Sequence, residues 1–203
     1  IDAHIDGFDG GASFLVPKNR LAQVRAEYGD AMIGRPDGQF VMRADEMDAI
    51  IKQSKGDISV IEDALGIPKG DWQGEELVRI DIRAVDDANV RMPNGKEGGA
   101  NEEWLPGGKL PTGYDEAVVD QVPKGKFTET DPFVKSEFYD TLDEAIPGLS
   151  RAEKDAAYHA IQSGQNRTVR PNVDDAKLQK FVDNNYRAQS KVGNGSTMDA
   201  ARA

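Results

Sequence analysis

The chain has no cysteine, only two histidines and few aromatic residues. The absence of cysteine excludes disulfide bonds, thiolate metal sites and a cysteine nucleophile. The two histidines, His4 and His159, lie far apart in the sequence, which argues against a histidine metal site or a serine triad. The sequence also lacks the dinucleotide-binding fingerprint, the phosphate-binding P-loop and zinc-ligand spacing. Any chemistry must therefore come from carboxylates, arginines and other polar side chains.

Long apolar runs and excess positive charge are also missing. No stretch approaches the ~20 apolar residues of a membrane helix, so we expect no membrane partner. The net charge is -11, and it is concentrated in residues 1–130, which hold 15 basic and 25 acidic side chains, against ten and eleven in residues 131–203. Because an acidic surface repels a phosphate backbone, this charge disfavours nucleic acid as a partner.

The two parts of the chain differ in predicted structure. Residues 1–130 alternate strand and helix patterns, whereas residues 131–203 show only helical spacing. We therefore predict an α+β fold: a small twisted, mostly antiparallel sheet with flanking helices, followed by an all-α helical segment. The chain begins without methionine and ends within a helical pattern, so we expect a fragment of a longer protein, truncated in its helical segment.

Apolar spacing and turn residues give the expected elements. Leu21, Val24 and Tyr28 recur at helical spacing, which predicts an amphipathic helix over residues 18–28. Two capping boxes, Ser59 with Glu62 and Ser150 with Glu153, predict helix starts. The expected strands are 12–17, 39–42, 77–82, 117–119 and 126–130, and the expected helices are 18–28, about 45–54, 59–65, one around 138–146, 150 to about 163, and 173 to about 188.

A long polar loop, residues 94–116, is the most informative segment. It joins two expected strands, and loops of this length are usually functional or disordered. Aromatic and carboxylate side chains between its glycines indicate a site rather than a linker. Its glycines are Gly95, Gly98, Gly99, Gly107, Gly108 and Gly113. Its polar and aromatic residues include Glu97, Asn101, Glu102, Glu103, Trp104, Thr112, Tyr114 and Glu116.

Glu116 is the strongest catalytic candidate because it comes directly before a strand, where rigid backbone would hold its carboxylate. Such a group can stabilise an oxocarbenium ion or act as a base, or it can be an ordinary solvated loop residue. Arg79 on the strand and Arg35 in a turn are candidate anion ligands, since arginine is a rigid bidentate donor. Alternatively, Arg79 lies on a solvent-facing strand surface. Trp104 either stacks on a ligand ring or anchors the loop to the core.

Six segments within residues 8–130 are distinctive: 10–17, 34–41, 64–68, 78–82, 98–102 and 106–108. Together they resemble C-terminal effector modules of bacterial polymorphic toxins, of the contact-dependent inhibition and rearrangement-hotspot types. The resemblance implies a secreted toxin delivered into the cytoplasm of a target cell, a cognate immunity protein, and a target protein in the recipient.

A glycine turn, a strand that carries an arginine, a Pro-Gly-Gly loop and a final strand follow one another over about 90 residues. This order is weakly similar to that of NAD-cleaving toxins of the tuberculosis necrotizing toxin type and of the ADP-ribosyltransferase superfamily. This similarity implies NAD as substrate, Arg79 or Arg35 as the residue that holds its phosphates or ribose, and Glu116 at the scissile bond. Glu116 and Arg79 are therefore the expected catalytic residues, and Arg35 is an expected substrate-binding residue. The remaining substrate-binding candidates are Asn101, Trp104, Gly107, Gly108 and Tyr114. The sequence departs from those toxins, which carry Gln-Tyr where this chain has Tyr114-Asp115-Glu116.

Two other functions stay open. In a metal-dependent nuclease toxin, loop carboxylates would bind a divalent cation, and Lys109, Lys124 and Lys126 would meet phosphates. In a non-enzymatic translocation or docking module, the active part of the toxin would lie beyond Ala203. The sequence favours the NAD-directed enzyme, either a glycohydrolase or an ADP-ribosyltransferase.

Overall fold

The structure is a computed structural model, and it describes residues 2–162 and residue 180. The chain divides into two compact units, Ile1–Ser136 and Glu137–Ala203, which are described separately. The helix expected over 173 to about 188 lies outside the described residues, apart from residue 180.

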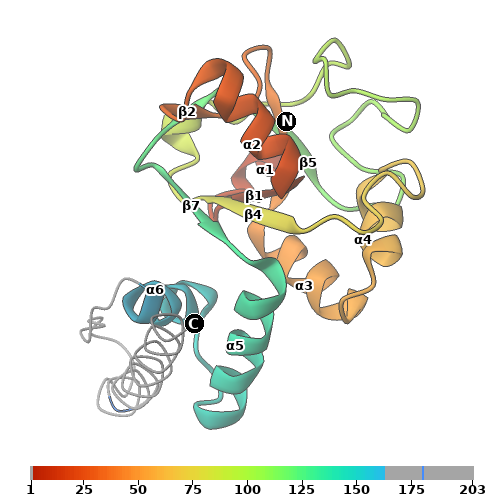
Figure 1. Ribbon diagram of the computed structural model, residues 1–203. Coiled ribbons are helices and arrows are strands. Elements are labelled where there is room, and N and C mark those ends of the chain that lie inside the picture. The colour runs from red at the N-terminus through yellow and green to blue at the C-terminus, as the bar shows by residue number, and fades with distance from the viewer. Residues whose placement is uncertain (1, 163–179, 181–203) are drawn as a thin grey trace. The chain divides into compact units, whose positions relative to one another are not determined.

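The first unit is built on a five-stranded antiparallel sheet with strand order β5-β3-β1-β4-β7. A separate two-stranded sheet pairs β2 with β6, and helices flank the larger sheet (Figure 1). This arrangement confirms the predicted α+β fold with an antiparallel sheet. The strands are β1 Ala12–Pro17, β2 Met32–Ile33, β3 Gln39–Arg43, β4 Leu77–Ile82, β5 Glu116–Val119, β6 Val122–Pro123 and β7 Phe127–Thr130.

The helices α2, α3, α4 and α6 agree closely with the predicted ranges, whereas α5 begins at Pro132, earlier than the expected range of about 138–146. The helix α1, the short 3₁₀ helix η1 and the two-residue strands β2 and β6 were not predicted. The helices are α1 Asp2–Asp6, α2 Lys18–Tyr28, α3 Ala44–Ser54, α4 Ile58–Leu65, η1 Asp86–Ala88, α5 Pro132–Ala145 and α6 Arg151–Gln162.

Both faces of the large sheet are covered by apolar residues, because side chains alternate along each strand. One face carries Phe14 and packs with Phe8 and with Leu21 of α2. The other face carries Leu15 and Met42 and packs against α3 and α4. The sheet is therefore the middle layer of the first unit.

Helix α2 has the predicted bounds, but the apolar residues that suggested an amphipathic helix do not form one buried face. Only Leu21 is buried, while Val24 is 46% exposed and Tyr28 is 75% exposed. Val24 and Tyr28 line a cavity beside the sheet instead of packing into its core. The helix thus contacts the core through one position.

The two predicted capping boxes have different outcomes. Ser150 and Glu153 form one, with the Glu153 carboxylate accepting from the Ser150 backbone N–H at 2.7 Å. At α4 the cap is Asp57, whose carboxylate accepts from the Ser59 N–H at 2.9 Å. Glu62 is buried and accepts from the backbone N–H groups of a later turn, including that of Trp72 at 2.6 Å, so it is not free to cap the helix.

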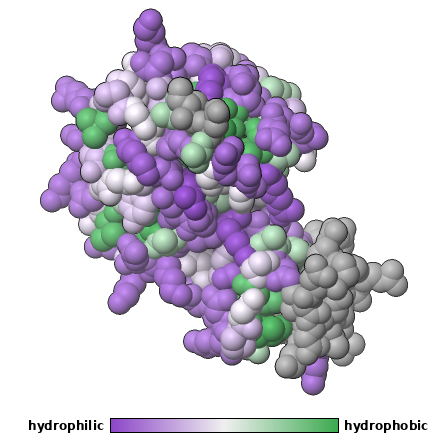
Figure 2. All heavy atoms as spheres, turned by 180° about the vertical axis from the view of Figure 1, so that it is seen from behind, coloured by the Kyte–Doolittle hydropathy of each residue, from purple (hydrophilic) through white to green (hydrophobic). Residues whose placement is uncertain are grey.

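In the second unit, α5 and α6 pack through an apolar cluster that includes Leu142 and Ala157. The buried Tyr139 hydroxyl donates to the Asp155 carboxylate at 2.5 Å. On the face shown in Figure 2, hydrophilic residues dominate and apolar residues form small patches, in keeping with a mean hydropathy of -0.61. Within the described part of the chain, no helix has both the length and the apolarity to cross a bilayer.

Candidate functional site

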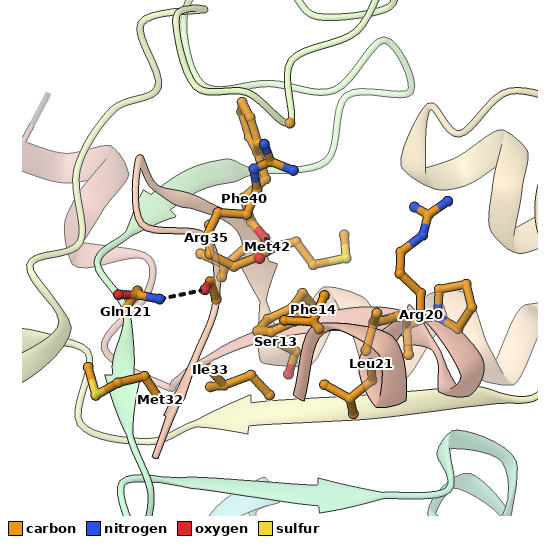
Figure 3. Close-up of a pocket in the computed structure, with 18 of the residues that line it drawn as sticks. Ser13, Phe14, Arg20, Leu21, Met32, Ile33, Arg35, Phe40, Met42 and Gln121 are labelled. Atoms are coloured by element: carbon orange, nitrogen blue, oxygen red, sulfur yellow. Dashed lines mark hydrogen bonds between the residues drawn. The ribbon is translucent and has the colours of Figure 1, made fainter. Parts of the chain in front are cut away.

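The large sheet opens between its neighbouring strands β1 and β3. Strand β1 pairs with β4 along all six of its residues, but with β3 only at Ala12 and Ser13. Beyond Ser13 the two strands have no paired residues, although both continue. A cavity of about 770 Å³ is lined by residues of both strands, of α2 and of the turn before β3 (Figure 3). This volume is within the range of small-molecule sites, roughly 300–1,000 Å³.

The cavity is mainly apolar, with a few charged side chains. Its lining draws on both faces of the sheet, since it includes Phe14 and Val41 of one face and Leu15 and Met42 of the other. Among the described residues that line it, the charged ones are Arg20, Arg25, Arg35 and Glu116. An apolar cavity with a few polar groups is typical of a ligand-binding site.

Glu116 is held at this cavity by strand pairing. As the first residue of β5 it lies opposite Met42 of β3, which in turn lies opposite Ser13 of β1. Burial raises the pKa of the Glu116 carboxyl to about 7, and the negative charge of Glu97 adds to that shift. A carboxyl group with this pKa takes up and releases protons near neutral pH, which suits an acid–base or cation-stabilising role.

Glu97 fixes the start of the glycine-rich loop. It is 4% exposed, and its carboxylate accepts from the backbone N–H of Asn94 at 3.2 Å and of Gly95 at 2.9 Å. The loop then meets the turn before β3, where the Gly98 N–H donates to the Asp37 carboxylate at 2.5 Å. These bonds hold the loop beside the cavity, and Gly99 lines it directly.

Arg35 lies in the turn between β2 and β3 with its side chain 49% exposed. Its Nε is 3.3 Å from the Asp37 carboxylate, and a Cβ on Gly98 would come 2.7 Å from that same carboxylate. A Cβ on Gly99 would come 2.9 Å from the ring of Phe40. The two glycines thus let the loop approach Arg35 and Phe40 closely at the edge of the cavity.

Arg79 occupies a different environment from Arg35. It is 2% exposed, and its guanidinium donates to Asp81 at 3.0 Å, to Asp48 at 2.6 Å and to the hydroxyl of Ser13 at 3.2 Å. The interpretation of Arg79 as a solvent-facing strand residue was therefore wrong, because protein carboxylates enclose it. Arg79 does not line the cavity, but its partner Ser13 does.

Asp81 and Lys135 complete this buried network. The Lys135 ammonium, which is fully buried, donates to the Asp81 carboxylate at 2.8 Å. Burial alone would raise the pKa of Asp81, but the charges of Arg79 and Lys135 and the Ser13 hydroxyl outweigh it and hold that pKa well below its usual range. The network reaches the cavity lining through Ser13, whose hydroxyl accepts from Arg79.

The structure places the aromatic loop candidates away from the cavity. The ring of Trp104 lies over Gly95, where a Cβ would come 2.7 Å from it, and its indole N–H is buried without a partner among the described residues. Tyr114 packs against the core cluster on the α3 and α4 face. Neither ring lines the cavity, and Trp104 has the packing of a loop anchor.

The remaining loop candidates have structural contacts or none. The Asn101 side-chain amide donates to the carbonyl of Gly66 at 2.9 Å. Gly107 is exposed, and a Cβ added there would meet no atom within 4 Å, whereas a Cβ on Gly108 would come 2.7 Å from His4 Nε2. The sequence-predicted residues that the structure brings together at one cavity are therefore Glu116 and Arg35.

The residue before Glu116 fastens the end of the loop. The Asp115 carboxylate contacts Lys109, lies 3.4 Å from the Arg43 guanidinium and lies 3.4 Å from His4 Nδ1. The His4 Nε2 hydrogen bonds with the backbone carbonyl of Glu116 at 2.9 Å. These contacts from α1 and β3 position the start of β5, and with it Glu116.

Arg20, Phe40 and Gln121 also line the cavity, and sequence reasoning did not select them. Phe40 follows the Gly34–Gly38 turn, and this position beside a glycine turn is the one sequence feature that could have suggested a place at the site. Nothing in the sequence indicates that the first turn of α2, which carries Arg20, lines the same cavity as the turn before β3. Within the described residues, no group of three or more histidine, aspartate or glutamate side chains is arranged to hold a metal ion.

Comparison of the chain with protein-family models, with curated proteins and with solved structures gave no match. A function for the cavity must therefore be inferred from its geometry and from the sequence resemblance.

Proposed function

We propose that this chain is a bacterial toxin effector domain that cleaves the nicotinamide–ribose bond of NAD, by hydrolysis or by transfer of ADP-ribose to a target protein. The observation that supports this most is that Glu116 and Arg35 line one mainly apolar cavity beside the glycine-rich loop. The resemblance to NAD-cleaving toxins implies Glu116 at the scissile bond and either Arg79 or Arg35 at the phosphates or ribose.

In the proposed reaction, Arg35 binds the anionic part of NAD and the Glu116 carboxylate lies beside the ribose. The bond between C1′ and the nicotinamide nitrogen breaks, and nicotinamide leaves with the electron pair as a neutral molecule. The ionised Glu116 carboxylate stabilises the positive charge that develops on the ribose. Water, or a nucleophile of the target protein, then attacks C1′ and loses its proton to a base.

The exposure and contacts of the two arginines favour Arg35 over Arg79 as the residue that binds the phosphates. Arg35 has a half-exposed side chain with one carboxylate contact, at 3.3 Å. The Arg79 guanidinium is buried and already surrounded by protein acceptors. A ligand phosphate would have to displace those carboxylates to reach Arg79, which the burial of the network opposes.

The test is nicotinamide release from NAD by the purified 203-residue chain and by Glu116→Gln. Glu102→Gln is the matched control, because it removes an exposed carboxylate from the same loop. We expect wild type and Glu102→Gln to release nicotinamide and Glu116→Gln to lose at least about a hundredfold in rate. Adding bacterial lysate separates hydrolysis from protein modification. Equal rates for Glu116→Gln and wild type would remove Glu116 from the reaction.

The resemblance to polymorphic toxins extends the proposal to the biological setting. The domain would be delivered into a competitor's cytoplasm, and a cognate immunity protein would cover the cavity. Expression of the chain inside bacteria should then arrest growth, and Glu116→Gln should relieve the arrest. Toxicity that does not depend on Glu116 would instead favour the nuclease alternative, which is tested on RNA and DNA with Mg²⁺.

A further inference from the structure

The charge at the cavity is opposite to that of the molecule around it. Residues 1–130 carry 25 acidic and 15 basic side chains, yet the charged residues lining the cavity are three arginines and Glu116, among the described residues. Oriented positive charge in a concave, low-dielectric setting attracts anions even when the net charge of the protein is negative. The cavity is therefore suited to an anionic ligand.

The three arginines differ in what they contact. Arg25 is bound by the Glu129 carboxylate through both terminal nitrogens, one of them at 3.2 Å, so its charge is already compensated. Arg35 has one carboxylate contact, at 3.3 Å through Nε. Arg20 is exposed, and within the described residues its guanidinium takes part in no hydrogen bond or ion pair. Two of the three arginines thus keep donors for a ligand.

Arg20 and Arg35 reach the cavity from different elements. Figure 3 shows Arg20 projecting from α2 and Arg35 from the turn before β3, with Met42 and Phe14 of the sheet also lining the space. Each guanidinium is a planar fork that can bind a phosphate through two hydrogen bonds. Arginines from two sides of one cavity are suited to a ligand with two linked phosphates. The apolar lining is suited to a flat aromatic base carried by a ribose of such a ligand.

We propose that Arg20 is a second anion-binding residue, that Arg20 and Arg35 together hold a pyrophosphate, and that the cavity therefore selects pyrophosphate-bridged dinucleotides over mononucleotides. This inference rests on the proposed NAD-cleaving function and specifies its substrate class. The scissile bond at Glu116 then lies at one end of a ligand whose phosphates are fixed by α2 and by the turn before β3.

The test is calorimetric binding of ADP-ribose and of AMP to the full chain. ADP-ribose carries the pyrophosphate but no nicotinamide, so it binds without being cleaved. We expect wild type to bind ADP-ribose more tightly than AMP, and Arg20→Gln to weaken ADP-ribose about tenfold or more. Arg20→Lys should restore part of the loss, since it keeps the charge but not the fork. Lys18→Gln is the control, because it removes a cation of α2 that is 2.6 Å from Glu76 and does not line the cavity.

ADP-ribose binding to Arg20→Gln as tight as to wild type would overturn the inference, as would equal affinity of wild type for ADP-ribose and AMP. Arg20 is exposed, so the variant should keep the unfolding temperature of wild type. Failure of the proposed NAD cleavage can be distinguished from failure of the proposed role of Arg20. If wild type binds ADP-ribose through Arg20 but releases no nicotinamide from NAD, the dinucleotide site stands and the cleavage proposal fails. If NAD is cleaved and Arg20→Gln binds normally, only the role of Arg20 fails.

Discussion

Glu97 lies close enough to Glu116 for its negative charge to add to the effect of burial, which raises the pKa of the Glu116 carboxyl to about 7. Glu97 is itself fixed by backbone N–H groups of the loop, so the two carboxyl groups are kept near one another. Pairs of carboxyl groups with different environments are common where one must change protonation state during a reaction. Glu97 belongs to the glycine-rich loop and Glu116 lines the cavity, so the pair links the loop to the cavity.

The raised pKa of Glu116 predicts a stability effect whose sign depends on pH. The folded state holds the proton to a higher pH than the unfolded chain does, so wild type loses stability as pH rises from about 4.3 to 7. Glu116→Gln removes this penalty. We expect it to be more stable than wild type at pH 8 by about 1–2 kcal/mol, a value reduced for its partial exposure. Thermal unfolding at pH 8 and pH 4.5 measures the effect, and the advantage should shrink at the lower pH.

Neutralising Glu97 should lower the pKa of Glu116 toward its usual range. In Glu97→Gln an oxygen remains to accept from the loop backbone, so the geometry should persist while the charge is lost. We expect the pH midpoint of kcat/KM for NAD, near 7 in wild type, to move down. Glu103→Gln, an exposed carboxylate of the same loop, should leave the midpoint unchanged. An unmoved midpoint in Glu97→Gln would show that another group controls the profile.

Removing the Arg79 guanidinium should destabilise the fold strongly. Arg79→Met leaves the buried carboxylate of Asp81 with less compensating charge, which typically costs about 3–5 kcal/mol. Because the pKa of Asp81 is depressed, this stabilisation is present at neutral pH and is lost in strong acid. Urea unfolding should show the loss at pH 7. Arg25→Met breaks the more exposed pair with Glu129 and should cost about 1 kcal/mol or less. Similar losses in the two variants would contradict the structural role of Arg79.

Adjacent glycines of the loop provide a matched pair. Gly107 and Gly108 have positive φ angles of 103° and 70°, so alanine strains the backbone at either. Only at Gly108 would the new Cβ also meet other atoms, coming 2.7 Å from His4 Nε2 and 3.0 Å from the backbone oxygen of Glu116. We expect Gly107→Ala to cost roughly 1 kcal/mol and Gly108→Ala to cost more. Unfolding in urea compares them, and equal losses would mean that the close approach of other atoms to Gly108 does not matter for stability.

The sequence was a good guide where local patterns decide the structure. Strand 77–82 has the predicted bounds because an alternating apolar pattern defines it. Helix 18–28 also has the predicted bounds, although only one of the apolar residues that suggested it is buried. The two-residue strands β2 and β6 were missed because each exists only through pairing with the other. The predicted capping box at Ser59 does not form, because the Glu62 carboxylate is buried against the turn that follows α4 and accepts from the backbone of that turn.

The site shows the same division. Glu116 could be selected as a candidate because a carboxylate that begins a strand after a long loop has a fixed backbone, and the structure does place it at the start of β5 and in the cavity lining. The environment of Arg79 could not be predicted from the sequence. Its partner Asp48 lies on α3, and its partner Asp81 is bound by Lys135 of α5, and no local sequence pattern indicates that these elements meet. Arg20 was missed for a related reason. Its place at the cavity depends on the point at which β1 and β3 stop pairing, which is set by tertiary packing.

In the proposed function, the cavity between β1 and β3 holds NAD with its nicotinamide–ribose bond at residue 116. A crystal structure of Glu116→Gln grown with NAD, in which the substrate should remain intact, would show this placement directly. We predict that the ribose will lie against the carboxamide that replaces the Glu116 carboxylate and that the phosphates will contact Arg35. NAD bound at a different surface, or a cavity left empty at saturating NAD, would contradict it.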